Sequence, residues 1–301
     1  MDGIITEIMR FSLKDGPGIR TTVFLKGCNM ACKWCHNPET LSMRPQLMRY
    51  PQKCIGCGEC VRACPNGALA AGDGSGGGII YYPEKCVSCG ACAGDCFSGA
   101  LVISGKKMSV GEVMAEIIQD MDYYRNSGGG VTISGGEAAC QPDFTAELLK
   151  AARDAGIRTA IETNMHADWN AYEKMLPYLD LVMLDIKLSD DAVHEKWTGV
   201  GNATVLENAR RISGLKPTIV RTPIIPGVTD DPGEIHKIAE IVKTLPNVTG
   251  FELLLYNPLG ESKYEALGEA HEFKGARPQG AELAGRLLEA AKASGVPVKI
   301  S

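Results

Sequence analysis

A duplicated cysteine run constrains this chain more than any other feature of its sequence. Four cysteines spaced C-x2-C-x2-C-x3-C recur 32 residues later, and the tetrapeptides at 66–69 and 98–101 repeat at the same offset. The two runs are Cys54, Cys57, Cys60 and Cys64, then Cys86, Cys89, Cys92 and Cys96. A unit of about fifty residues buries too little apolar surface to fold alone, so bound metal must stabilise it. We therefore predict a two-fold pseudo-symmetric metal module at 53–103, with its halves joined by a flexible glycine-rich turn at 72–78.

The spacing of the two runs is that of bacterial two-cluster ferredoxins, in which the fourth cysteine of each run ligates the other cluster. Two [4Fe-4S] clusters are therefore predicted, and their ligand sets are Cys54, Cys57 and Cys60 with Cys96, and Cys86, Cys89 and Cys92 with Cys64. A zinc module is the alternative, but zinc sites usually pair two C-x2-C knuckles. One departure from the repeat is Phe97, which stands where the first half has Pro65.

A third, separate group has only three thiols. Cys28, Cys32 and Cys35 follow the spacing C-x3-C-x2-C, and of the chain's 12 cysteines only Cys140 remains outside these groups. Three ligands on a four-iron cluster leave one iron open, and an open coordination position is typical of a reactive metal centre. Spacing alone leaves a zinc site completed by His36 as an alternative.

Around the module, short apolar strands alternate with amphipathic helices. Strands are predicted at 21–25, 131–134, 158–162, 181–187, 218–225, 251–256 and 296–300, and helices at 110–124, 143–155, 169–176, 203–213, 232–245 and 281–293. This βαβ order predicts an α/β fold with a parallel sheet, and six or seven units fall short of a closed barrel. We predict a partial (β/α)6-type TIM barrel from 1–52 and 104–301, with a small α+β ferredoxin-like domain inserted at 53–103.

Composition excludes several function classes. The net charge is -5, with Lys+Arg 31 against Asp+Glu 36 and no basic block, so neither nucleic acid nor an anionic membrane is an expected partner. No apolar run approaches the roughly 18 residues of a membrane span. The first residues lack the apolar segment of a secretory signal, so we expect a cytoplasmic protein whose thiols stay reduced.

The motifs surrounding the third cysteine group resemble the glycyl-radical-enzyme activating enzymes of the radical S-adenosylmethionine (SAM) superfamily. The matching segments run from about Gly3 to the C-terminus in the family's order: 15–20 (DGPGIR), 28–38 with its three cysteines, 134–137 (SGGE), 162–164 (ETN), 185–187 (DIK) and 221–227 (RTPIIPG). Ala138 departs from the family, which often has proline there. The ferredoxin-like insertion resembles the subgroup whose partners are not of the pyruvate formate-lyase type.

The resemblance implies an oxidoreductase that reductively cleaves SAM to methionine and a 5′-deoxyadenosyl radical. That radical takes a Cα hydrogen from a glycine of a partner glycyl radical enzyme. The cluster of Cys28, Cys32 and Cys35 would hold SAM through its open iron. The implied cofactor-binding residues are Trp34, Gly135, Gly136, Glu137, Glu162, Thr163, Met183, Asp185, Lys187 and Asn257.

Two further sets of roles come from the same resemblance. Glu162, Thr163, Met183 and Asp185 match positions at which relatives bind a monovalent cation beside the SAM carboxylate. Asp15 and Arg221 are the candidates for contacting the partner's glycine loop, and a simple surface ion pair is the alternative for them.

The complete cofactor set is then three [4Fe-4S] clusters, of which one binds SAM and two relay electrons. The expected electron donor is a low-potential reductant such as flavodoxin or ferredoxin. We expect a monomer, with a bacterial microcompartment shared with the partner as one location. Two alternatives stay open: a radical SAM enzyme acting on a small molecule or another macromolecule, and a multi-cluster electron-transfer protein. The unpaired Cys28 group argues against the electron-transfer protein, and segments 15–20 and 221–227 argue against the other enzyme.

Overall fold

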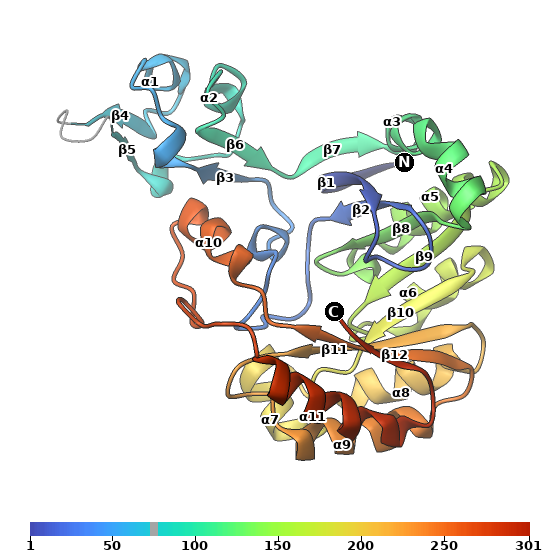
Figure 1. The fold of residues 1–301 in the computed structure, drawn as a ribbon. Helices are drawn as coiled ribbons and strands as arrows, with labels where there is room; N and C mark the ends of the chain where they lie inside the picture. Colours follow the sequence, from blue (N-terminus) through green and yellow to red (C-terminus); the bar gives the residue numbers. More distant parts are fainter. Residues whose placement is uncertain (73–77) are drawn as a thin grey trace.

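A nine-stranded sheet organises the chain (Figure 1). The computed structural model describes residues 1–72 and 78–301, so most of the predicted turn at 72–78 lies outside the described residues. The strands of the sheet follow the spatial order β13-β12-β11-β10-β9-β8-β2-β1-β7. They are β1 (Asp2–Ser12), β2 (Arg20–Leu25), β7 (Lys106–Ser109), β8 (Gly130–Gly135), β9 (Arg158–Thr163), β10 (Leu181–Asp185), β11 (Thr218–Ile224), β12 (Val248–Leu255) and β13 (Val298–Ile300).

The sheet is mostly parallel, as the βαβ pattern predicts. Every neighbouring pair from β2 to β13 is parallel, whereas β1 pairs antiparallel with both β2 and β7. Its helices are α3 (Val110–Ile117), α4 (Met121–Ser127), α5 (Pro142–Asp154), α6 (Trp169–Met175), α7 (Asp191–Thr198), α8 (Ala203–Ser213), α9 (Pro232–Lys243), α10 (Glu261–Leu267) and α11 (Ala281–Ala291). None of the helices in 1–72 and 78–301 is long and apolar enough to cross a membrane.

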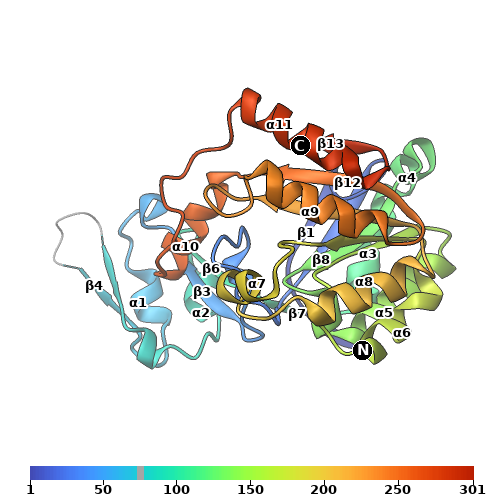
Figure 2. The ribbon, with the colours of Figure 1, turned by 90° about the horizontal axis from the view of Figure 1, so that it is seen from below.

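Helix α5 illustrates how sequence signals place the helices on the sheet. It begins with Pro142 at its first turn, and just beyond its end Gly156 adopts a φ of +77°. Its apolar face buries Phe144, Leu148 and Leu149. Successive helices α5, α6, α8 and α9 flank the sheet in chain order (Figure 2). The carboxyl ends of the parallel strands remain available for a site.

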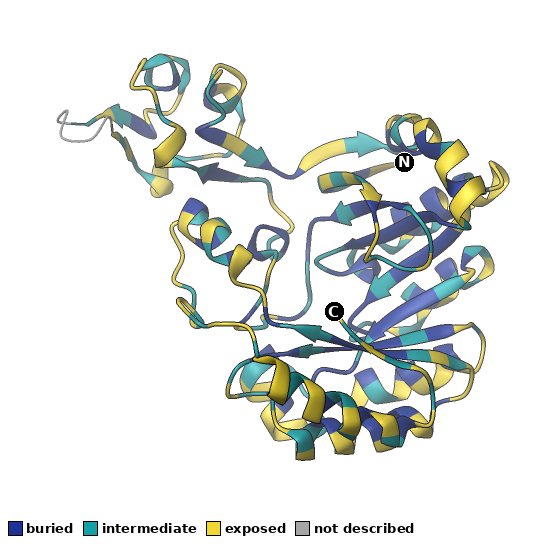
Figure 3. Cartoon of the chain, in the orientation of Figure 1, coloured by how far each residue is buried: buried dark blue, intermediate teal, exposed yellow. Residues whose placement is uncertain are grey.

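The cysteine-rich segment forms a small module beside the sheet (Figures 1 and 3). It contains two antiparallel strand pairs and two short helices: β3 (Gln46–Arg49) with β6 (Leu101–Ser104), β4 (Leu69–Ala71) with β5 (Ile79–Tyr81), α1 (Glu59–Ala63) and α2 (Ala91–Gly94). Its buried apolar core consists of only Leu47, Cys60, Leu69, Cys92 and Leu101 among the described residues. Strand β3 precedes the expected boundary at 53, yet it pairs with β6 inside the module.

The fold differs from the sequence prediction in several elements. The helix predicted at 110–124 is interrupted at 118–120, because the buried carboxylate of Asp120 is held by Arg10 and Thr21 of the neighbouring strands. The sequence also did not indicate strands β1 and β7 or helices α7 and α10. Strand β7 depends on pairing with the distant β1, which local patterns do not report.

Candidate active site

A cavity of about 420 Å³ opens at the carboxyl ends of the parallel strands. Strands β8 to β11 each contribute polar or glycine residues to its wall, namely Ser134, Gly135, Glu162, Thr163, Asp185 and Arg221. Because parallel strands present all their carboxyl ends at one edge, residues from distant segments meet there. The cavity therefore lies at the edge of the sheet at which parallel α/β folds carry their active sites.

Three cysteine thiols line this cavity from the loop that follows β2. Cys28, Cys32 and Cys35 are half-buried, and the loop is fixed by backbone hydrogen bonds such as Gly27 N–H to the Thr40 carbonyl at 2.6 Å. Gly27 has a φ of +101°, which a residue with a side chain rarely adopts. Burial raises the pKa of all three thiols, that of Cys35 to about 12. Metal binding at this loop must therefore displace protons from buried thiols.

Asn164, at the end of β9, contacts the cysteine loop from across the cavity. Its side-chain amide donates to the Cys28 sulfur at 3.6 Å and to the Asn29 side-chain oxygen at 2.9 Å. Sequence analysis had placed Asn164 only in a family motif and gave it no role. The signal was present in that motif, but the contact with Cys28 depends on β9 lying beside the loop after β2.

The Gly-Gly-Glu segment after β8 divides into two parts with different surroundings. Gly135 and Gly136 line the cavity, and a Cβ on either one would come within 2.2 Å of backbone atoms. The Glu137 carboxylate instead accepts hydrogen bonds from the Thr163 hydroxyl and from the backbone N–H of Ala139 and Asn164. Burial raises the pKa of Glu137 to about 7. Its side chain is therefore positioned to join β8 to β9 and is not part of the cavity wall.

Two acidic side chains, Glu162 and Asp185, line the cavity and are held there by polar or basic neighbours. Glu162 accepts a hydrogen bond from the Ser134 hydroxyl at 2.5 Å, and Asp185 forms an ion pair with Lys187. Burial is the largest single influence on the pKa of the Lys187 ammonium and lowers it, but the attractions of Asp185, Cys32 and Cys28 together outweigh burial and the net shift is upward. Lys187 is thus held in its charged form at the cavity wall.

The remaining predicted cofactor residues divide between the wall and the interior. Trp34 and Asn257 line the cavity, and the Trp34 ring packs edge-on against Phe273 with ring centres 6.4 Å apart. Met183 is buried inside β10, where its methyl group lies close to Gly16. The structure thus brings the predicted cofactor-binding residues together except for the side chains of Glu137 and Met183.

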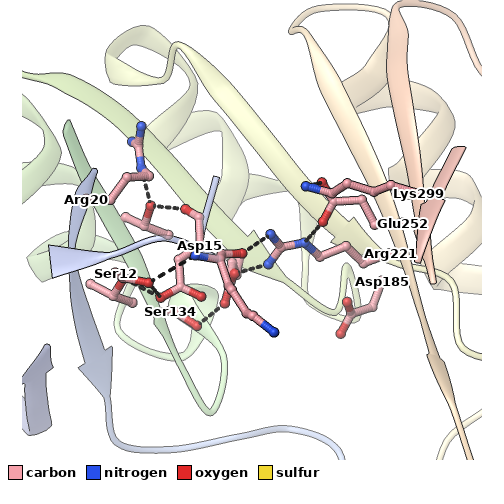
Figure 4. A network of polar contacts seen from close by, with 12 residues as sticks. Ser12, Asp15, Arg20, Ser134, Asp185, Arg221, Glu252 and Lys299 are labelled. Carbon is pink, nitrogen blue, oxygen red and sulfur yellow. Dashed lines mark hydrogen bonds and ion pairs between the residues drawn. The ribbon is translucent and has the colours of Figure 1, made fainter. Parts of the chain in front are cut away.

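Arg221 is buried in a network of acidic residues at the edge of the cavity (Figure 4). Its guanidinium pairs with Glu162, donates to Glu252 at 3.0 Å and donates to the Lys14 carbonyl at 2.6 Å. The attraction of these carboxylates outweighs the opposing effect of burial and raises the pKa of Arg221. Sequence analysis missed Glu252, which β12 supplies.

Asp15 also lies at the cavity but has different partners. Its carboxylate accepts hydrogen bonds from the hydroxyls of Ser12 and Thr22, both at 2.6 Å. Among the described residues, the ion pairs of Arg221 are with Glu162 and Glu252, so the simple surface pair considered from the sequence is not what the structure contains.

The module has two smaller cysteine-lined cavities. We call the first the outer cavity, which is lined by Cys54, Cys57, Cys60 and Cys96, and the second the inner cavity, which is lined by Cys64, Cys86, Cys89 and Cys92. Each cavity combines three cysteines of one run with the fourth of the other. In 1–72 and 78–301, no three His, Cys, Asp or Glu side chains are arranged to hold a single metal ion. The four thiols of each set instead line one cavity together, which is the arrangement that a cluster of several metal atoms requires.

Family models match three segments of the chain. Residues 83–239 match the radical SAM superfamily, 53–100 match a 4Fe-4S dicluster domain, and 14–67 match a 4Fe-4S single cluster domain. The last match covers the loop with Cys28, Cys32 and Cys35.

Individual proteins give a consistent picture. The chain is 42% identical over 305 residues to the benzylsuccinate synthase activating enzyme of Thauera aromatica, covering 99% of this chain and 92% of that protein. It is 41% identical over 272 residues to the isethionate sulfite-lyase activating enzyme of Desulfovibrio desulfuricans, covering 88% and 86%. A radical SAM methyltransferase from Sphaerobacter thermophilus has a similar fold, with a TM-score of 0.50 and 14% identity over 65% of this chain and 58% of that one.

Proposed function

We infer the function of this chain from its family, because it belongs to the radical SAM superfamily and, within it, to the activating enzymes of glycyl radical enzymes. The enzyme cleaves SAM reductively to methionine and a 5′-deoxyadenosyl radical, and thereby activates a partner glycyl radical enzyme. One observation carries this conclusion in the structure. Three thiols from a single loop line a cavity at the carboxyl ends of the sheet, the edge at which parallel α/β folds carry their active sites.

The residues at this cavity fit an iron–sulfur cluster with one open iron. A [4Fe-4S] cluster on Cys28, Cys32 and Cys35 would supply the coordination position for SAM and the electron that breaks its S–C5′ bond. Gly135 and Gly136 let this part of the cavity wall pack closely against the backbone of Leu25 and Gly27, which leads into the cysteine loop. Lys187 lines the same cavity, and its positive charge would balance the carboxylate of SAM.

A monovalent cation would bind near Glu162 and Asp185. Both carboxylates line the cavity, but Arg221 and Lys187 already balance part of their charge. A cation beside them would therefore bind weakly until the carboxylate of SAM adds another negative charge.

The module would hold two further [4Fe-4S] clusters, which brings the total to three. The outer and inner cavities support crossed ligation, because each combines cysteines from both runs. Replacing Cys54 and Cys96 by alanine should remove about four of twelve irons, whereas replacing Cys54 and Cys64 should damage both clusters. Equal iron loss in the two double variants would contradict the crossed arrangement.

The finer architecture is also part of this proposal. An open sheet with β13 and β7 at its edges supports a partial barrel with the ferredoxin-like module inserted. The pairing of β3 with β6 favours a module that begins at Gln46 and not at 53. We further propose a monomer in the cytoplasm, reduced by a small low-potential carrier such as flavodoxin or ferredoxin. The microcompartment has no support beyond the resemblance.

The decisive experiment removes the thiols of the active-site loop. Alanine at Cys28, Cys32 and Cys35 together should abolish 5′-deoxyadenosine formation and remove about four irons, while about eight stay with the module. EPR of the glycyl radical on the partner should vanish in parallel. Tightly bound zinc without inorganic sulfide in anaerobically prepared wild-type protein would refute the proposal. Full 5′-deoxyadenosine formation with no glycyl radical on any candidate partner would favour a small-molecule enzyme.

A further inference from the structure

We propose that the rim of the outer cavity, where Ile55 and Cys57 line the cavity and the exposed Phe97 stands between the lining residues Cys96 and Ser98, is the docking site for a small one-electron carrier protein. This inference rests on the proposed function, since it assigns the place at which the required electron enters the chain. It names the surface at which the electron enters and the order in which the two clusters of the module carry it. The predicted ligand sets alone give neither.

Phe97 is the first reason for choosing this rim. Its side chain is 95% exposed, the highest value among the large hydrophobic residues that are described as exposed. It directly follows Cys96, one of the four thiols of the outer cavity. The repeat-equivalent position beside the inner cavity is occupied by Pro65, so the aromatic side chain is not needed for the ferredoxin-like fold itself. A single exposed apolar residue is common, so Phe97 supports a docking surface through its place next to a cluster ligand and together with Ile55.

Ile55 is the second exposed apolar side chain at this cavity. It follows Cys54, lines the outer cavity and is 72% exposed. Val87 is its repeat-equivalent at the inner cavity and is 67% exposed, and both cavities have one exposed thiol. Exposure alone therefore does not distinguish the two cavities; the combination of an aliphatic and an aromatic side chain does.

The position of the outer cavity along the strands gives the direction of electron flow. Strands β3 and β6 join the rest of the molecule at Gln46 and Ser104, where Lys26 and Glu39 hold them. The inner cavity is lined by Leu47 and Ile103 near this junction. The outer cavity is lined by Arg49 and Leu101 at the far ends of the same strands. The module projects away from the sheet at this end (Figures 1 and 3).

An electron from outside must reach the Cys28 loop, which lies on the far side of the junction. Entry at the outer cavity uses both clusters in sequence, whereas entry at the inner cavity would leave the outer cluster without a role in the relay. The step itself is simple: the carrier is oxidised by one electron, the outer cluster is reduced by one, and no atom or proton is transferred. The occupant is therefore a protein with its own redox centre close to an apolar edge.

Charge also limits the kind of contact. Segment 53–103 contains three basic and four acidic residues, so the module offers no strong field of either sign. Binding through Ile55 and Phe97 should bury a small interface area, as transient redox complexes do. Because the contact is apolar, its affinity should depend only weakly on the salt concentration.

The test compares repeat-equivalent positions in the fully iron-loaded enzyme. Phe97→Ser and Ile55→Ser remove the rim, and Val87→Ser is the matched control at the inner cavity. Flavodoxin carrying FMN is the first probe and a two-cluster ferredoxin is the second. Binding is measured by calorimetry, and reduction of the enzyme's clusters by stopped-flow absorbance with either the reduced carrier or dithionite.

We expect Phe97→Ser to weaken binding of at least one carrier by at least about tenfold, and Ile55→Ser by a smaller factor. Carrier-driven reduction should slow in proportion, while iron content and dithionite-driven reduction stay within about twofold of the wild type. Val87→Ser should match the wild type in every measurement.

Several results would overturn the docking site. Unchanged binding of both carriers by Phe97→Ser would do so, as would an equal loss for Val87→Ser. Slower reduction by dithionite as well would assign Phe97 to the cluster instead of to docking. A change in oligomeric state, or in affinity for the glycyl radical partner with carrier binding intact, would assign the rim to those proteins. Failure of the wild type to cleave SAM with dithionite would refute the proposed function, whereas the binding comparison would still decide the docking site.

Discussion

The sheet and the inserted module achieve stability by different physical means. The central strands of the sheet bury residues completely, among them Val131, Ile133, Ile161, Leu184 and Val220, and its apolar core continues through the packed helices. The described core of the module has five buried residues, of which two are the cysteines Cys60 and Cys92. The sheet can fold through burial of apolar surface, whereas the module needs what its thiols bind.

The pKa values of the cysteine thiols also differ between the active-site loop and the module. Burial raises the pKa of Cys28 and Cys35 in the active-site loop. In the module the effects are mixed: burial raises the pKa of Cys60 and Cys92, that of Cys92 to about 11, whereas for Cys64 and Cys96 hydrogen bonds from backbone N–H groups, and from Ser98 for Cys96, together outweigh burial and lower the pKa. Each four-cysteine set thus has one thiol that hydrogen bonds favour in its ionised form, whereas burial disfavours that form for all three thiols of the active-site loop.

The largest effect should come from removing the iron. Anaerobic chelation should unfold the module, because bound metal can contribute about 10 kcal/mol or more to the folding of such small units. The sheet should keep its structure. Limited proteolysis should then cut within 46–104 and leave the fragments of the sheet associated, and hydrogen exchange should stay slow in β8 to β11. If the sheet and the module were equally protected from proteolysis and hydrogen exchange after iron removal, the proposed difference in how they are stabilised would be wrong.

Arg221→Ala should destabilise the sheet by roughly 3–5 kcal/mol, because it removes the buried cation that Glu162 and the buried Glu252 share. The matched control is Lys299→Ala, which removes an exposed partner of the same Glu252 and should cost less than about 1 kcal/mol. Thermal unfolding of the iron-loaded protein measures both. This expectation also means that Arg221→Ala cannot isolate a contact with the partner.

Asp15→Asn is the cleaner test of partner binding. An asparagine oxygen can still accept the hydrogen bonds from Ser12 and Thr22, so the loop should keep its shape while the charge is lost. Glycyl-radical yield should fall at least about tenfold, or 1.4 kcal/mol, with SAM cleavage in the absence of the partner within about threefold. EPR and quantification of 5′-deoxyadenosine provide the two readouts. Parallel loss of both would place Asp15 in the SAM pocket.

The smallest expected effect concerns Asn164. Asn164→Ala removes the amide that donates to the Cys28 sulfur, so the cluster on that loop should become harder to reduce. A hydrogen bond of about 1 kcal/mol corresponds to a shift of about 40 mV toward negative potential. Redox titration of the active-site cluster measures it, and the potentials of the module's clusters serve as the internal control. An unchanged potential would show that the contact is only structural.

Much of the fold could be predicted because it depends on local signals. The helix at 203–213 has the predicted bounds, and β8, β9 and β11 differ from prediction by one or two residues at their ends. Cysteine spacing indicated three groups of ligands without any knowledge of the fold. Strand β7 could not be predicted in this way, since it pairs with residues of β1 that lie about one hundred positions earlier in the chain.

The sequence by itself determined the chemistry of this protein: eleven cysteines at three sets of spacings, and motifs that identify a radical SAM activating enzyme. Tertiary structure decided which of the motif residues face the cavity. Glu162 and Asp185 do, whereas the carboxylate of Glu137 turns away to hold β9, and Arg221 is enclosed by Glu162 and Glu252. The reason is physical. Spacing along a chain fixes which residues can share a ligand, but the direction and partners of a buried side chain depend on strands that only the folded sheet brings together.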